Sequence, residues 1–92
     1  MMIRNYITIE ELMQIIELSD KENNIDLESF LLKMSKKAKR LPNDMLENIV
    51  DLLKYEHQIS CDADLYKLSL NKLMELVKDI NKLARDYRVD FK

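Results

Sequence analysis

Residues 66–91 read YKLSLNKLMELVKDINKLARDYRVDF, and this stretch carries the strongest structural pattern in the chain. Apolar side chains recur in it at alternating steps of four and three residues: Tyr66, Leu70, Leu73, Val77, Ile80, Ala84, Tyr87 and Phe91. This is heptad spacing sustained over almost four heptads, which places one apolar seam along a helix. Neither proline nor glycine interrupts it. The sequence therefore predicts one long helix from about residue 60 or 62 to about residue 88.

A shorter helix is expected to begin at Thr8. Thr8 and Glu11 have the Thr-x-x-Glu spacing of a capping box, in which the two side chains satisfy two backbone amides at a helix start. Ile7 and Leu12 have the spacing of the hydrophobic staple that accompanies such a box. The polar residues 19–24 predict the end of this helix.

Two further amphipathic helices are expected between this helix and the long one. The first uses Asp26 as its N-cap. It ends near Leu41, because Pro42 disfavours helical geometry in the residue before it. The second begins within residues 42–44 and fades around residues 57–60.

Together these elements predict an all-α fold, a four-helix bundle with a long C-terminal helix that carries the heptad seam. A length of 92 residues indicates a single domain, 1–92, with residues 1–7 as an N-terminal arm. The long helix spans about 42 Å and its neighbours about 20–25 Å, so a simple bundle leaves its far end uncovered. That end could be covered in three ways: by two shorter helices packed end to end, by the N-terminal arm, or by another molecule. Another molecule would contact the distal seam: Ile80, Leu83, Ala84, Tyr87 and Phe91.

The composition excludes several classes of site. The chain has no glycine, so the phosphate-binding loops of nucleotide-binding proteins are excluded. A single cysteine excludes a disulfide framework and a multi-cysteine zinc site. His57 and Cys61 are spaced like two metal ligands, but they straddle an expected helix junction, which favours a structural role. We therefore predict no catalytic residues, no metal site, no cofactor and no enzymatic activity.

A basic cluster stands out in a chain whose net charge is −2. Residues 33–41 hold five bases and no acid. Four of the bases share one helix face, because their spacing is i, i+3, i+4 and i+7: Lys33, Lys36, Lys37 and Arg40. Such a face either docks on an acidic protein surface or a nucleic acid, or is a solvated helix end where cations suit the helix dipole.

These observations favour a small regulatory or inhibitory protein that docks on another protein through the basic face and the distal seam. We expect a homodimer in the cytoplasm, in the host cell if the source is viral, with no membrane partner. The bias toward Ile, Lys, Asn and Asp is typical of a low-GC bacterium, a phage or a virus. The alternative is a dimeric nucleic-acid-binding transcriptional regulator that uses the second and third helices as its recognition pair.

Overall fold

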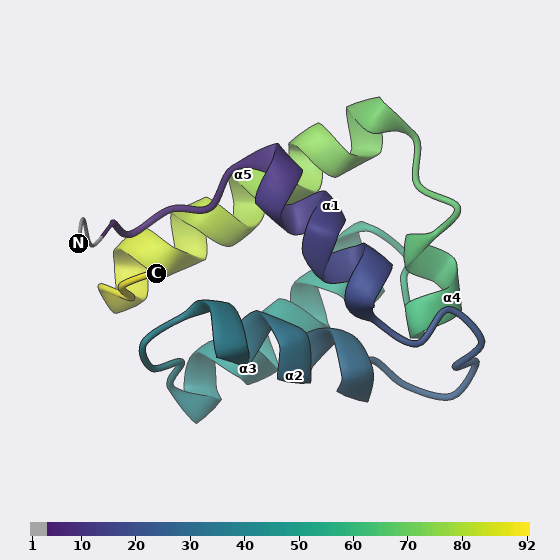
Figure 1. Ribbon diagram of the computed structural model, residues 1–92, viewed down its shortest axis with the longest axis horizontal. Helices are drawn as coiled ribbons and strands as arrows, with labels where there is room; N and C mark the ends of the chain where they lie inside the picture. The colour runs from purple at the N-terminus through teal and green to yellow at the C-terminus, as the bar shows by residue number, and fades with distance from the viewer. Residues whose placement is uncertain (1–3) are drawn as a thin grey trace.

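A computed structural model describes residues 4–92, which are predominantly helical (Figure 1). Its α-helices are α1 (Ile9–Leu18), α2 (Glu28–Lys37), α3 (Asn43–Asp51), α4 (Asp62–Leu65) and α5 (Leu70–Tyr87), and a π-helical turn, η1 (Leu52–Glu56), extends α3. Residues 4–92 contain no β-strand, only two isolated bridges that both involve Phe91. The predicted all-α class is therefore confirmed.

The start of α1 agrees with its prediction. The Glu11 amide donates to the Thr8 hydroxyl at 3.1 Å, and the Thr8 amide donates to the Glu11 carboxylate at 3.0 Å, so both halves of the capping box are present. Ile7 and Leu12, the predicted staple residues, are both buried in the core. The capping signal read from the local sequence is therefore present at this helix start.

The helix α2 ends four residues earlier than predicted. It stops at Lys37, and Ala38 is already extended. The C-terminal segment accounts for this difference, because the Lys39 amide donates to the Asp90 carbonyl at 2.9 Å and the Lys92 amide donates to the Lys37 carbonyl at 3.0 Å. This strand-like pairing, with its Ala38–Phe91 bridge, competes with the next helical turn.

The predicted long C-terminal helix is wrong, because α4 and α5 are separate helices. The chain turns after Leu65, and Ser69 caps α5 by accepting the Lys72 amide at 3.3 Å. Tyr66, in the turn between α4 and α5, is held against the end of α1. Its hydroxyl lies 2.7 Å from the Ile16 carbonyl and 2.9 Å from the Ser19 carbonyl and donates to them. The first two positions of the heptad pattern, Tyr66 and Leu70, are accordingly exposed.

The far end of α5 is covered from within the chain. The principal helix contacts pair α1 with α2 and α5, α3 with α5 and η1, and α2 with α4. At the C-terminal end of α5, the segment before α1 pairs with the last residues through the Arg4–Phe91 bridge (Figure 1). The Asn81 side chain also bonds the Ile7 amide and carbonyl at 2.8 and 2.9 Å. The described part of the predicted arm therefore packs on the helices, while residues 1–3 lie outside the described residues.

A buried carboxylate joins α4 to the start of α2. Asp62 is fully buried and accepts the Phe30 amide at 3.0 Å and the Asn23 side-chain amide at 2.9 Å. Phe30 lies in the first turn of α2, so Asp62 supplies from a distant position the capping acceptor that a preceding residue usually provides. Asp26, the predicted N-cap, accepts the Glu28 amide and the Asn23 side-chain amide, and the N-cap residue is Leu27.

Candidate functional site

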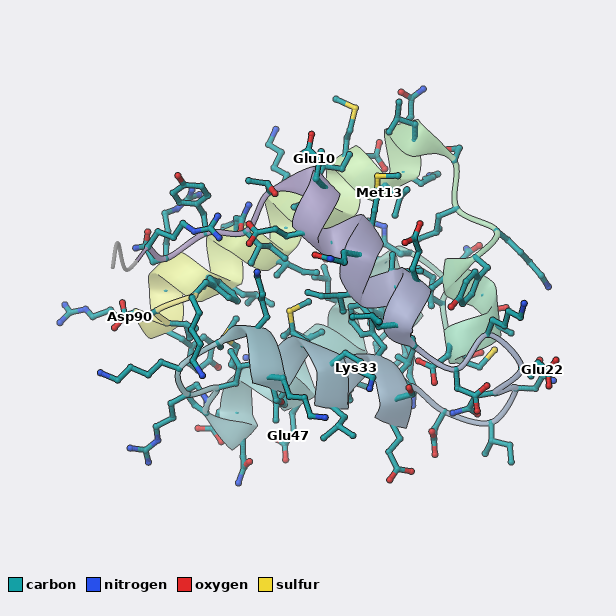
Figure 2. The ribbon with its side chains drawn as sticks, viewed as in Figure 1. Glu10, Met13, Glu22, Lys33, Glu47 and Asp90 are labelled. Carbon is teal, nitrogen blue, oxygen red and sulfur yellow. The ribbon has the colours of Figure 1, made fainter. Side chains whose placement is uncertain are left out.

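The basic cluster borders a groove between α1 and α2. The groove has a volume of about 330 Å³ and is lined by Gln14, Ile15, Leu18, Lys33, Lys36 and Lys37. Ile15 is buried and forms an apolar base, whereas Leu18, the last residue of α1, is 62% exposed at the rim. Figure 2 labels Lys33 on α2, the helix drawn below α1 in this view. The groove therefore combines apolar surface with a one-sided positive rim.

The three lysines of this groove differ in their partners. The Lys37 ammonium lies 2.7 Å from the Glu11 carboxylate, which also binds the Arg4 guanidinium. The pKa of Glu11 is held well below its ordinary value of 4.5, chiefly by the bond from Arg4 and also by Lys37. Within residues 4–92, neither Lys33 nor Lys36 forms an ion pair. The charges of these two lysines are therefore available to a partner.

The Glu11 cluster predicts an acid-sensitive contribution to stability. A carboxylate whose pKa is lowered by folding contributes its full stabilisation above its unfolded pKa, near 4.5. This contribution begins to decrease below that value and is lost as the pH falls through the lower folded pKa. We expect Glu11→Gln to lower the free energy of unfolding by about 2 kcal/mol at pH 7. Urea unfolding should show a smaller difference from the parent at pH 3 than at pH 7. An equal difference at both pH values would contradict this assignment.

Arg40 does not share the helix face predicted for it. Because α2 ends at Lys37, Arg40 lies in the extended connection to α3. It lines a separate hollow with Lys39, Pro42 and residues 87–90. The predicted basic face is therefore reduced to the three lysines of the α1–α2 groove.

Most of the predicted distal seam is not available to a partner. Ile80, Ala84 and Phe91 are buried in the core of the single chain. Leu83 and Tyr87 are half-buried and pack against the same core, and the Tyr87 hydroxyl accepts the Asn48 amide at 2.5 Å. Helices α1 and α3 pack against α5, and the segment before α1 pairs with the C-terminal residues, so these parts of the same chain cover most of the seam.

His57 is not paired with Cys61, the possible co-ligand that the sequence suggested. Its Nε2 atom lies 2.9 Å from the Asp79 carboxylate on α5, whereas Cys61 is a buried free thiol. Glu56 also places its carboxylate near this pair. The role of Asp79 was missed, because no local spacing connects a position on α5 with one that follows η1.

A hollow next to this pair is strongly acidic. It has a volume of about 460 Å³ and lies between α3, η1 and α5. Four carboxylates line it, from Asp51, Glu56, Asp79 and Asp86, and Lys82 is the single cation among its lining residues in the described part of the chain. Tyr55, which is 79% exposed, stands at its edge. The α1–α2 groove is basic and this hollow is acidic, and the two are built from different helices.

None of the helices described in residues 4–92 combines the length and apolar composition needed to cross a membrane. Comparisons with known protein families, curated proteins and solved structures found no match to this chain.

Proposed function

We propose that this protein is a small non-enzymatic interaction module, of a regulatory or inhibitory kind, that docks on another protein through the α1–α2 groove. The observation that carries the proposal is the groove itself, where exposed Leu18 adjoins two lysines without ion-pair partners. The fitting partner is an acidic segment that also presents apolar side chains. It would act by occupying a surface of that partner, without turnover.

The two parts of the groove contribute differently to such binding. Leu18 and Ile15 supply apolar area, whose removal from water drives association. Lys33 and Lys36 supply complementarity to carboxylates, which sets orientation and raises the association rate. The net charge of the whole chain is −2, so this positive rim is a local feature. We therefore expect binding that weakens with salt but retains an apolar component.

The test uses a synthetic 15-residue amphipathic peptide rich in Glu and Leu as its probe. Lys33→Glu combined with Lys36→Glu should weaken binding at least about tenfold, as measured by titration calorimetry. Leu18→Ala should weaken it several-fold at every salt concentration. The matched control is Lys72→Glu with Lys78→Glu, which makes the same charge change at exposed positions of α5 and should leave binding unchanged.

Three results would contradict the proposal. The peptide could fail to bind, or it could bind the groove variant and the control equally well. Thirdly, a 20-base-pair duplex DNA could bind where the peptide does not, with a steep salt dependence that the groove variant removes. That last result would favour the nucleic-acid-binding alternative. Light scattering of the free protein, run in parallel, records whether it is a monomer or the expected homodimer.

A further inference from the structure

The residues next to the acidic hollow gather three metal-binding side chains at one point. Glu56 and His57 come from the end of η1, and Asp79 faces them from α5. One ligand atom from each lies within 4.8 Å of the other two, and the His57 Nε2 and Asp79 Oδ2 atoms are 2.9 Å apart. We propose that Glu56, His57 and Asp79 bind a divalent transition-metal cation, for which zinc is the probe.

The spacing of these atoms suits a shared cation. Metal bonds to imidazole nitrogen and carboxylate oxygen are about 2.1 Å long, which places neighbouring ligand atoms about 3.0 Å apart in an octahedron and about 3.4 Å apart in a tetrahedron. The His57–Asp79 distance of 2.9 Å therefore needs an adjustment of about 0.1 Å for an octahedral site and about 0.5 Å for a tetrahedral one. Glu56 is exposed, so its side chain can rotate to close the remaining distance.

The chemistry of the three groups selects the class of cation. Imidazole nitrogen is a ligand for zinc and other late first-row metals, whereas calcium and magnesium sites are built from oxygen atoms. Two carboxylates balance the charge of a dication. With three protein ligands, coordination positions remain for water, as in open zinc sites.

The surroundings favour a cation at this point. The His57 side chain is only 6% exposed, so packing holds its ring against Asp79. Asp51 and Asp86 line the same hollow and add negative potential, which Lys82 offsets only in part. The site therefore combines a buried imidazole with a negative electrostatic potential that attracts cations.

Zinc chloride alone, titrated into the full chain by calorimetry and followed by thermal unfolding, tests the site. We expect one zinc ion per chain and a rise in Tm of roughly 10 °C when free zinc is about 100 times the Kd. Glu56→Gln and Asp79→Asn should each weaken binding at least about tenfold. Glu75→Gln, an exposed change elsewhere on α5, and Cys61→Ser should leave the affinity unchanged.

Several outcomes would overturn the proposal. These are the absence of saturable zinc binding, equal affinity in Glu56→Gln, Asp79→Asn and the parent, or loss of binding in Cys61→Ser. Glu56 is exposed and makes no hydrogen bond through its side chain among the described residues, so Glu56→Gln should fold normally and keeps the test decisive. Circular dichroism verifies the fold of each variant. None of these readouts depends on peptide binding to the α1–α2 groove.

Discussion

Phe91→Ala is expected to lower the free energy of unfolding by about 4 kcal/mol, because it empties a fully enclosed site. Phe91 is 1% exposed and belongs to the main core cluster, although it is the penultimate residue of the chain. Its backbone bridges Arg4 on one side and Ala38 on the other. Removing the ring would therefore weaken the packing of the N-terminal and C-terminal segments against α5. The change in the free energy of unfolding is measured by urea unfolding, followed by circular dichroism.

The matched control is Tyr55→Ala, which removes an aromatic ring that is 79% exposed. It should change the stability by no more than about 0.5 kcal/mol. Light scattering of the same samples distinguishes burial of Phe91 within one chain from burial at the dimer interface that the heptad pattern predicted. A parent dimer that becomes a stable, folded monomer in Phe91→Ala would return Phe91 to an intermolecular seam and contradict its burial within one chain.

Asp62→Ala is expected to cost about 3 kcal/mol of unfolding free energy. The change leaves the buried Phe30 amide without its acceptor, removes the bond from Asn23, and leaves a small cavity. Burial raises the pKa of Asp62, so protonation favours the folded state. The pH-dependent part of its contribution is therefore largest below the unfolded pKa and falls as the pH rises through the folded pKa, opposite in sign to that of Glu11.

Asp62→Asn gives a graded comparison, since an amide oxygen can still accept the Phe30 amide. We expect the free energy of unfolding of Asp62→Asn to lie between that of the parent and that of Asp62→Ala. Asp86→Ala serves as the control because Asp86 is exposed, and it should change stability by no more than about 0.5 kcal/mol. Full stability of Asp62→Ala in thermal and urea unfolding would show that this carboxylate does not hold α2 to α4.

Local signals in the sequence predicted part of the fold well. The start of α1 follows from Thr8 and Glu11, which lie within one turn of each other. The break between α4 and α5 could not be predicted in this way, because Tyr66 reaches carbonyl groups at the end of α1, about fifty residues away. The early end of α2 likewise depends on pairing with residues 90–92. The heptad spacing that begins at Tyr66 continues across the break between α4 and α5 and so gives no sign of it.

The sequence likewise predicted only part of the α1–α2 groove. The spacing of Lys33, Lys36 and Lys37 placed them together on α2, and all three line the α1–α2 groove. Leu18 was missed as their neighbour, because only the packing of α1 on α2 brings its helix end beside the lysines. Arg40 fitted the same spacing but depended on a helix that ends before it.

Docking at the α1–α2 groove can be mapped residue by residue from amide chemical-shift changes when the acidic amphipathic peptide is added to the isotope-labelled protein. The proposal predicts the largest changes at Gln14, Leu18, Lys33 and Lys36, which line the α1–α2 groove. Changes centred instead on η1 and α5, or no change with the peptide in large excess, would contradict it.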